Sequence, residues 1–406
     1  MTTPRPAHSP DPLAELAPEN LARVYAGLRQ TAPVHWSVHF GGWVLTRHAD
    51  AVRVLGDPAF LADDPIARLT RIEARGGPSL PNLRTVLASV AFYTNPPRHG
   101  VLRRFTSHLF QRLEMSGLRV RLEDHAAALL AAARLAGGID LVAGYGGDLA
   151  LFAIHTLLGL PSEDCVALAG VARDIGWIFD ASPRSLRELR HAESEVGRLL
   201  DYFEPAIAAR RAGREADGFS TLVRLNDAEL GLGDRDLAGF CTFFFIGGQE
   251  TTATGIAASA VMLLEEDAAR AALTANAGKL TGAAREFLRL AAPFQYVVRV
   301  ATADAAIGGE TIGAGERVNI ILGAANRDPA AYPHPDTIDF DRAAPDSLAF
   351  GHGAYRCLGA GLAQVETEVA LAGLVANPDL RLAPGTAVWG KQTRVPSLTR
   401  AWAEFG

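Results

Sequence analysis

One segment, residues 236–266, constrains the fold more than any other, because it is a long helical pattern that is apolar on every face of its first half. It reads DLAGFCTFFFIGGQETTATGIAASAVMLLEE. A helix that is apolar all round is buried in the centre of a protein, and Asp234 is its predicted N-cap. The sequence therefore predicts a large protein built around this helix.

Two features in the middle of this helix oppose its stability. Gly247 and Gly248 each cost roughly 1 kcal/mol relative to alanine. The run Glu250-Thr251-Thr252 places polar groups where burial is expected. A kinked core helix with a glycine pair for close packing explains both features, and a functional site explains them equally well.

Composition excludes several other classes of protein. Of the 406 residues, 49% are hydrophobic, which is enough to bury a large core and argues against disorder. The 3 cysteines are too few for a disulfide scaffold and indicate a cytoplasmic protein with reduced thiols. A net charge of −6 without long runs of one sign argues against nucleic-acid binding.

No segment indicates a membrane or secretion. The first residues, MTTPRPAHSPDP, are polar and proline-rich, unlike a signal peptide. The most apolar stretch, LAGFCTFFFIGG, is far shorter than the roughly 20 residues that span a bilayer. The expectation is a protein without a membrane segment.

The pattern along the chain predicts mainly α structure with minor β structure. Residues 34–48 alternate around a Gly-Gly pair and predict a hairpin, followed by a short helix at 49–57. Helical patterns fill about 102–266, alternation returns at about 299–321 with Gly308-Gly309 as a turn, and a last helix covers about 358–377. Without a linker or repeat, we expect a disordered tail at 1–15 and a single domain at 16–406.

The segment FGHGAYRCLGAGLAQVE, residues 350–366, surrounds one cysteine with glycines immediately before a helix. Glycines allow a tight loop that a flat ligand or metal approaches closely, and the helix N-terminus favours the thiolate of Cys357. With this chain's residue frequencies the pattern F-G-x-G-x-x-x-C-x-G is expected about once in ten thousand chains. A buried structural cysteine is the alternative, and it suits Cys165 and Cys241, which lie in apolar helical runs.

This loop, together with the central helix, resembles the cytochrome P-450 family of haem-thiolate monooxygenases, of the soluble bacterial type, over nearly the whole chain. The resemblance implies the P-450 fold, with a central buried helix and small β-sheets, and haem b (iron protoporphyrin IX) as cofactor. It implies Cys357 as the axial ligand of the haem iron, a thiolate that favours O–O cleavage. The surrounding cofactor-binding positions that it implies are Phe350, Gly351, Gly353 and Gly359.

The resemblance also assigns the middle of the central helix, because GGQETT matches the family's oxygen-activation motif. Gly247 and Gly248 then make room for the cofactor, and Glu250 and Thr251 relay protons to bound dioxygen. The Thr251 hydroxyl is expected to bond back to the Gly247 carbonyl and open the helix there.

Further positions follow from the resemblance. Glu286 and Arg289, on one helical face, match a structural pair that Arg342 completes; read alone, they are an ordinary solvated ion pair. In NPPRHGVLRR, Asn95 is the predicted N-cap with Pro96 in the first turn, so His99 and Arg103 lie one turn apart. The propionate contacts that the resemblance implies are His99, Arg103, Arg299 and, in place of a usual histidine, Tyr355.

The substrate and the electron donor are defined only by class. The substrate-lining candidates are mainly large and apolar, which suggests an apolar or aromatic organic substrate; they are Phe243, Ile246, Gly247, Phe294, Gln295, Tyr296 and Val297. Read alone, any single one of them is more often simply a core residue. The chain has no flavin or nicotinamide motif, so the resemblance implies a separate ferredoxin and ferredoxin reductase, with a basic docking face at Arg103, Arg104, Arg112 and Arg356.

Three functions fit these observations. The first is a monooxygenase that inserts one atom of O2 into its substrate. The second is the same fold catalysing another oxidation, such as coupling, desaturation or a peroxide-driven reaction, and the third is a haem-binding sensor without turnover. The sequence departs from the usual bacterial pattern at Val101, Gln249, Tyr355 and Gly361, and none of these changes removes a group that the chemistry requires.

Overall fold

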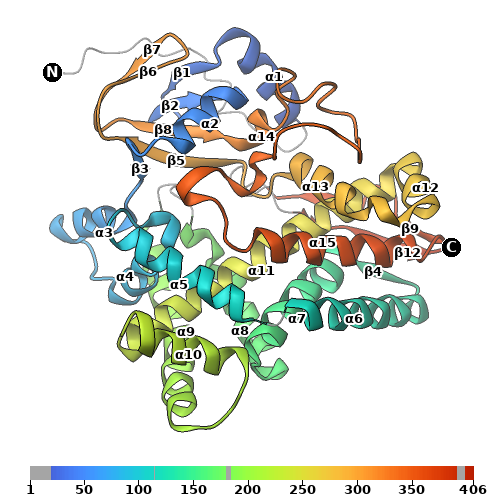
Figure 1. Ribbon diagram of the computed structural model, residues 1–406, viewed down its shortest axis with the longest axis horizontal. Helices are drawn as coiled ribbons and strands as arrows, with labels where there is room; N and C mark the ends of the chain where they lie inside the picture. The colour runs from blue at the N-terminus through green and yellow to red at the C-terminus, as the bar shows by residue number, and fades with distance from the viewer. Residues whose placement is uncertain (1–19, 114, 180–183, 391–397) are drawn as a thin grey trace. The chain divides into compact units, whose positions relative to one another are not determined.

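The computed structural model describes residues 20–113, 115–179, 184–390 and 398–406 (Figure 1). The chain falls into two compact units. Unit 1 comprises residues 1–63, 126–146 and 254–406, and unit 2 comprises residues 64–125 and 147–253. Helices α6 (Met115–Ala136) and α11 (Asp234–Glu265) each begin in unit 2 and end in unit 1. The predicted tail 1–15 lies outside the described residues, and the single domain at 16–406 stays a prediction.

Unit 1 is built on a five-stranded mixed sheet with the order β1-β2-β8-β5-β3. The predicted hairpin is confirmed: β1 (Val34–Ser37) pairs antiparallel with β2 (Gly42–Leu45), and Gly41 takes the left-handed conformation between them. β2 is parallel to β8 (Arg317–Ile321), and β8 is antiparallel to β5 (Tyr296–Ala301), which pairs with β3 (Phe60–Ala62). The sheet therefore joins the N-terminal segment to strands that lie about 250 residues later.

Helix α2 (His48–Gly56) covers this sheet through a shared apolar cluster. Val54 and Leu55 of the helix are buried with Val318 and Ile320 of β8. Leu348, shortly before the cysteine loop, belongs to the same cluster. Burial of such side chains stabilises each by about 1.5–3 kcal/mol, so the cysteine loop begins from a well-packed apolar cluster of unit 1.

Helices and smaller sheets complete unit 1. In Figure 1, α13 (Leu280–Ala291) lies along α15 (Ala360–Val375). A second sheet has the order β4-β12-β9, and the turn between β6 and β7 contains Gly308 and Gly309, both with positive φ as a tight hairpin requires. The remaining elements of this unit are α1 (Leu21–Thr31), β4 (Gly138–Asp140), η4 (Leu141–Gly146), α12 (Asp267–Ala275), η6 (Ala277–Lys279), β6 (Ala305–Ile307), β7 (Glu310–Ile312), α14 (Leu322–Ala325), η7 (Leu348–Phe350), η8 (Gly353–Tyr355), β9 (Leu380–Leu382), β10 (Val388–Trp389), β11 (Leu398–Arg400) and β12 (Trp402–Phe405).

Unit 2 is helical in its described part, with helices packed around buried aromatic rings. Phe203 lies within 6.1 Å of Phe219 and 6.3 Å of Phe245, measured between ring centroids. The carboxylate of Glu193 accepts hydrogen bonds from the N–H groups of Asn82 and Leu83 and so caps α4. The elements are α3 (Pro65–Ala74), α4 (Pro81–Ala88), η3 (Ala91–Tyr93), α5 (Arg98–Arg112), α7 (Gly147–Leu158), α8 (Ser162–Ile175), η5 (Gly176–Phe179), α9 (Leu186–Ala212) and α10 (Gly218–Glu229).

Two helix starts differ from prediction. Helix α5 begins at Arg98 with Pro97 as its cap, instead of at Asn95. The reason is that Asn95 and Pro96 each precede a proline, which disfavours the helical conformation at both. Helix α11 includes Asp234 in its first turn, so Asp234 favours the helix through its charge at the N-terminus and is not the residue before it.

A different segment from the one singled out in the sequence is long and apolar enough to cross a membrane. It is residues 141–158, of which half is buried inside the structure. Core helices of soluble proteins satisfy the same criterion of length and composition. This segment is therefore weak evidence for a membrane span.

Candidate active site

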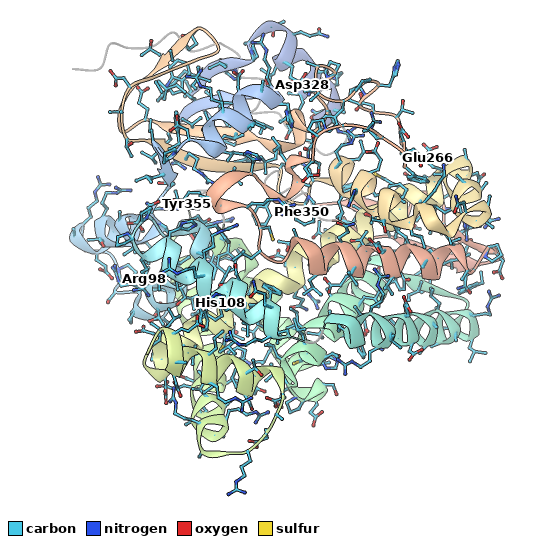
Figure 2. The ribbon with its side chains drawn as sticks, in the orientation of Figure 1. Arg98, His108, Glu266, Asp328, Phe350 and Tyr355 are labelled. Carbon is cyan, nitrogen blue, oxygen red and sulfur yellow. The ribbon has the colours of Figure 1, made fainter. Side chains whose placement is uncertain are left out.

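Cys357 lies in a tight loop of unit 1 between η8 and α15. Its backbone N–H donates to the carbonyl of Phe350 at 2.9 Å, which closes the loop. Gly351 has φ +71° and ψ −168°, a conformation essentially restricted to glycine. Phe350 and Tyr355 are labelled in Figure 2 on either side of the turn. Cys357 is exposed, so the loop presents its sulfur, a potential metal ligand, at the surface of unit 1.

A second glycine fixes where the loop packs. Gly353 has φ +68°, and a methyl group placed on it would lie 3.2 Å from the Cα of Gly56 and closer still to the carbonyl oxygen of Leu55. Any larger residue would therefore push the loop away from the end of α2. The glycines are explained by backbone geometry, as the sequence predicted for a tight loop.

The side chain of Asn326 holds the start of the loop. Its Oδ1 accepts a hydrogen bond from the N–H of Leu348 at 2.7 Å, and its Nδ2 donates to the carbonyl of Arg289 at 3.2 Å. Asn326 is completely buried. Because Leu348 begins the turn that ends at Phe350, this asparagine links α13 to the cysteine loop. The sequence gives no indication that Asn326 has this role, because its partners lie 22 and 37 residues away in the chain.

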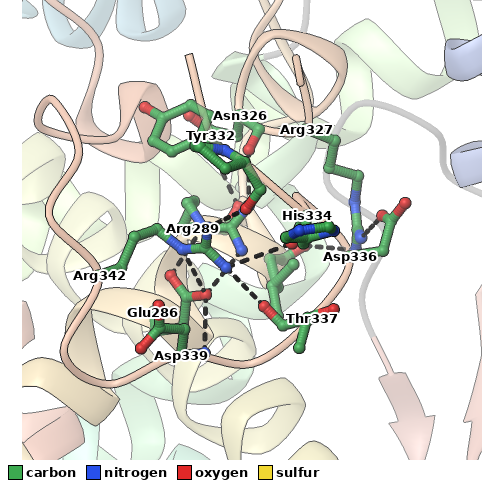
Figure 3. A network of polar contacts seen from close by, with 12 residues as sticks. Glu286, Arg289, Asn326, Arg327, Tyr332, His334, Asp336, Thr337, Asp339 and Arg342 are labelled. Atoms are coloured by element: carbon green, nitrogen blue, oxygen red, sulfur yellow. Dashed lines mark hydrogen bonds and ion pairs between the residues drawn. The ribbon is translucent and has the colours of Figure 1, made fainter. Parts of the chain in front are cut away.

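The three residues grouped in the sequence as Glu286, Arg289 and Arg342 meet in the structure (Figure 3). The Glu286 carboxylate accepts from Arg289 Nε and Nη2 at 2.8 Å each and from Arg342 Nε at 3.0 Å. It also accepts from the N–H of Asp339 at 3.1 Å. Glu286 and Arg289 are 4% and 2% exposed, so the interpretation as a solvated surface ion pair is wrong. Their spacing alone could not reveal that the face is buried.

Arg342 and Arg289 extend this network to the irregular segment that follows α14. Arg342 donates to the carbonyls of Pro333 at 2.6 Å and Thr337 at 2.7 Å. Arg289 donates to the carbonyl of Asn326 at 2.7 Å, and its guanidinium carbon lies 5.2 Å from the centroid of the Tyr332 ring. Two arginines thus bind several backbone carbonyls of a segment without regular structure and hold it to α13.

Arg299 and Tyr355 lie against each other in unit 1. Arg299, on β5, is 6% exposed, and its guanidinium carbon stands 4.4 Å from the centroid of the Tyr355 ring. Arg299 also donates to the carbonyl of Val298 at 2.8 Å. Burial raises the pKa of Tyr355, opposed by a backbone hydrogen bond with Ala62 and by the Arg299 charge. The tyrosine therefore stays a neutral hydroxyl that positions a buried cation.

The donor set of unit 1 fits a haem. An accessible cysteine sulfur on a rigid loop suits iron, for which thiolate is an established axial ligand. A guanidinium in a buried position suits the carboxylate of a propionate, because such pairs form charge-assisted hydrogen bonds. Within the described residues no group of three or more His, Cys, Asp or Glu side chains offers an alternative metal site.

Glu250 and Thr251 lie on the part of α11 that belongs to unit 2. The Thr251 hydroxyl donates to the carbonyl of Gly247 at 2.8 Å, as the sequence predicts. Burial raises the pKa of Glu250 to about 7. Gly248 packs closely on α7, since a methyl group there would lie 2.5 Å from Cδ1 of Ile154. Of the glycine pair, Gly248 thus serves close packing, whereas a methyl on Gly247 would meet only the Phe243 ring, at 3.3 Å.

His99 and Arg103 also lie in unit 2, one turn apart on α5. Arg98 and His108, labelled in Figure 2, mark the course of this helix. His99 is buried, Arg103 is partly buried, and Arg104 is exposed. The same helix therefore carries charges at several depths, and the shift of its start to Arg98 leaves the spacing of His99 and Arg103 unchanged.

Comparison with known proteins decides the family. A family model described as Cytochrome P450 matches residues 201–401. Vitamin D(3) 25-hydroxylase of Pseudonocardia autotrophica is 32% identical over 403 residues, which cover 96% of this chain and 94% of that protein. The chain belongs to the cytochrome P450 family.

Further relatives agree on the fold and the class of reaction. Vitamin D3 dihydroxylase of Streptomyces griseolus is 32% identical over 410 residues, covering 96% of this P450 and 97% of that protein. The crystal structure of P450BioI, in complex with acyl carrier protein ligated to hexadec-9Z-enoic acid, has a TM-score of 0.86 and 27% identity and covers 96% and 99% of the two chains. This P450 is therefore a haem-iron monooxygenase, an oxidoreductase, with the mainly helical fold of its family.

The substrate-lining candidates divide into two groups by burial. Phe243, Gly247, Phe294 and Val297 are partly exposed, whereas Ile246, Gln295 and Tyr296 are buried. Gln295 donates to the carbonyls of Ala291 and Ala292 at 3.1 and 2.8 Å, which stabilises the chain after α13. The role of the seven residues in substrate binding stays a prediction for this P450.

Sequence reasoning missed two rings that lie with Phe243 in unit 2. The centroid of Phe243 is 5.9 Å from that of Phe92 and 5.7 Å from that of Phe179. The sequence carries only weak signals for them, since neither follows a helical period. Cys165 and Cys241 are almost completely buried, which confirms their interpretation as core thiols, and this burial raises their pKa values.

Proposed function

We propose that this P450 inserts one atom of O2 into an apolar or aromatic organic substrate, with protons delivered by Glu250 and Thr251. The observation that carries the proposal is their local geometry on α11. The Thr251 hydroxyl is held at 2.8 Å from the Gly247 carbonyl, and the residue before it in the chain, Glu250, carries a carboxyl group whose pKa is raised to about 7. An acid with a pKa near the working pH is the most efficient proton donor and acceptor.

The cofactor in this proposal is haem b, whose iron Cys357 would bind. When bound, haem would supply the binding and activation of O2. Arg299, His99 and Arg103 would bind the propionates, and Phe350, Gly351 and Gly359 shape the loop around the sulfur. Glu286, Arg289 and Arg342 have a structural role, because they hold the segments on either side of Asn326.

Thr251 and Glu250 act in sequence. The Thr251 hydroxyl donates a hydrogen bond to the carbonyl of Gly247, so the lone pairs of its oxygen are available to accept a proton or a hydrogen bond. This side-chain bond shares the Gly247 carbonyl with the helix backbone, and α11 remains helical through residues 247–251, so the expected opening of the helix is not observed. Glu250 gains protons from solvent, because within the described residues no cation forms an ion pair with it that would hold it as a carboxylate. A proton that Glu250 passes to the Thr251 oxygen is balanced when that hydroxyl releases its original hydrogen to the acceptor, so both side chains return to their starting state.

Replacing Thr251 by Val and Glu250 by Gln tests this relay. Each change is expected to lower the fraction of consumed O2 that appears in product by roughly tenfold or more, with peroxide released instead, because general acid catalysis contributes about 10²–10⁴. In the unaltered enzyme this fraction falls as pH rises through about 7, and E250Q removes that dependence. The measurement is product formed per O2 consumed. Thr252→Val is the matched control, and an equal loss in that variant contradicts the relay.

The same experiment separates the alternative functions. A peroxide-driven enzyme would turn over with peroxide and without reductant, and E250Q would leave that rate unchanged. A sensor would bind ligands without forming product. The intact acid–alcohol pair favours the O2-dependent reaction over both.

The apolar substrate class rests on the rings beside the relay. Phe92, Phe179 and Phe243 offer aromatic surface that favours apolar ligands. Two relatives are named for vitamin D(3) or vitamin D3, and the solved P450BioI complex contains a hexadecenoic acid, all of them large and apolar. This likeness supports the class of substrate and not any one compound.

Ferredoxin and ferredoxin reductase are the proposed electron donors, in the cytoplasm. Exposed arginines of α5 offer a basic docking surface, although Arg112 lies 3.7 Å from Glu229, which offsets part of its charge. Arg104 and Arg356 are exposed as well. An anionic partner would be steered to such a surface in a salt-dependent manner.

The double substitution Arg104→Gln and Arg112→Gln removes two positive charges. It is expected to raise the ferredoxin concentration needed for half-maximal rate by about three- to tenfold at low salt. The difference from the unaltered enzyme shrinks as salt screens the charges. Steady-state rates at several ionic strengths measure it. Arg198→Gln, on the exposed face of α9, is the control. A rate and salt dependence unaffected by the double change would contradict this docking surface.

A further inference from the structure

Gly176, the first residue of η5, lies directly against the carboxyl group of Glu250. A methyl group placed on Gly176 would stand 2.5 Å from Cδ and 2.9 Å from Oε1 of Glu250, and closer still to Oε2. Real Cβ atoms essentially never come within 3.0 Å of another heavy atom. Gly176 is buried and takes φ −51° and ψ −28°, an ordinary helical conformation. Its backbone therefore does not require glycine, whereas the observed position of the Glu250 carboxyl group does.

The segment that carries Gly176 is held at its other end. The Tyr93 hydroxyl, itself buried, donates a hydrogen bond to the carbonyl of Phe179, the last residue of η5. The Phe179 ring also lies edge-on to Phe243 of α11, with centroids 5.7 Å apart. The short helix is thereby fixed to η3 and to α11, so it cannot simply move away from Glu250.

We propose that Gly176 is a positioning residue for Glu250. The backbone of η5 at Gly176 sets where the carboxyl group lies, and the hydrogen bond from Tyr93 holds η5 in place. The inference rests on the proposed function of Glu250 as a proton relay. The clash in a substituted protein would fall on the end of a flexible side chain. An alanine at this position is therefore accommodated by rotation of the Glu250 side chain, which leaves the fold intact and displaces the carboxyl group.

The first test is Gly176→Ala in the haem-loaded enzyme. Product formed per O2 consumed is expected to fall roughly tenfold, because a displacement of about 1 Å at a reacting group costs up to 10²-fold. Gly170→Ala is the matched control: Gly170 lies on the preceding helix α8, and nothing lies within 4 Å of a methyl group there. Thermal unfolding of both variants confirms that the fold is kept.

A second readout follows the carboxyl group without reference to activity. The infrared carbonyl band of protonated Glu250, recorded below pH 7 and identified by its absence in E250Q, reports the surroundings of that group. The band is expected to shift in Gly176→Ala and to stay in place in Gly170→Ala. Tyr93→Phe removes the hydrogen bond to Phe179 and is expected to shift the band in the same way by a smaller amount, which keeps the test available if Gly176→Ala unfolds.

A double substitution checks that the two residues act through contact. Glu250→Asp shortens the side chain by one methylene group and so withdraws the carboxyl group from Gly176. Adding Gly176→Ala to E250D should therefore cause no further loss of coupling, which is the product formed per O2 consumed. Such non-additivity is expected only for residues in contact. Equal losses from Gly176→Ala in both backgrounds, or an unshifted band with normal coupling in Gly176→Ala, would overturn the inference.

The outcomes also separate the inference from the relay on which it rests. Normal coupling in E250Q overturns the relay, whatever Gly176→Ala does. In that case a shifted band in Gly176→Ala still supports the positioning of Glu250 by Gly176. A loss of coupling in E250Q together with an unshifted band in Gly176→Ala overturns the positioning and leaves the relay in place.

Discussion

Cys357→Ala is expected to abolish the difference band that a reduced thiolate-ligated haem gives with carbon monoxide, and with it product formation. The backbone of the loop closes through the N–H of residue 357 and the carbonyl of Phe350, at 2.9 Å, so alanine leaves the loop intact and removes only the sulfur. No other described thiol can replace it, because Cys165 and Cys241 are buried. Activity is expected to fall at least 10³-fold, below detection in most assays.

Two further variants make this result specific. Cys357→His retains a ligand for iron but not a thiolate, so it is expected to bind haem while the band moves to the position typical of histidine ligation. Cys165→Ala, the same chemical change in the core of α8, is expected to lower stability by about 1 kcal/mol and to leave the band unchanged. A thiolate band that survives in Cys357→Ala would refute the axial assignment.

Local patterns explain which parts of the fold the sequence predicts. The hairpin of β1 and β2, the Gly308-Gly309 turn and the helix after Cys357 each depend on neighbouring residues, so alternation, turn residues and helical periods are sufficient. Helix α5 is one exception, because two consecutive prolines delay its start to Arg98. Pairing of β2 with β8 joins residues about 270 positions apart, and no local pattern specifies that partner.

The candidate site divides in the same way. Cys357 is recognisable because glycines and a helix start surround it in a short motif, and Glu250 and Thr251 become candidates because GGQETT resembles the family's motif. Gly176 and Asn326 are not, because their importance comes from contacts with residues 74 and 22 positions away. A glycine in an ordinary helical conformation carries no sign in the sequence that it makes room for a carboxyl group. Such residues are found only once the packing is known.

Glu286→Gln is expected to lower the free energy of unfolding by about 3–5 kcal/mol, the usual cost of leaving a buried charge without its partner. The amide keeps the shape of the side chain and can still accept from Asp339 N–H. It cannot offset the charges of Arg289 and Arg342, which stand 2.8 and 3.0 Å from the carboxylate in a buried position. Denaturant unfolding of the haem-loaded protein measures the change.

The chain contains a matched control for this effect. Glu195 and Arg198 on α9 have the same i,i+3 spacing and a 2.7 Å contact, but the Arg198 side chain is 65% exposed. Glu195→Gln should therefore change stability by less than about 1 kcal/mol. Similar losses in the two variants would mean that burial is not what makes the Glu286 network important.

Glu286→Gln is also expected to loosen the cysteine loop at a lower temperature than that at which the whole protein unfolds. Arg289 donates to the carbonyl of Asn326, and Asn326 accepts from the N–H of Leu348, where the turn leading to Phe350 and Cys357 begins. A displaced Arg289 therefore weakens the support of the loop through a continuous series of hydrogen bonds. Haem release from Glu286→Gln, followed by its absorption during heating, should precede loss of helical circular dichroism, whereas in Glu195→Gln the two should coincide. Coincident transitions in Glu286→Gln would show that the network stabilises the fold without specifically supporting the loop.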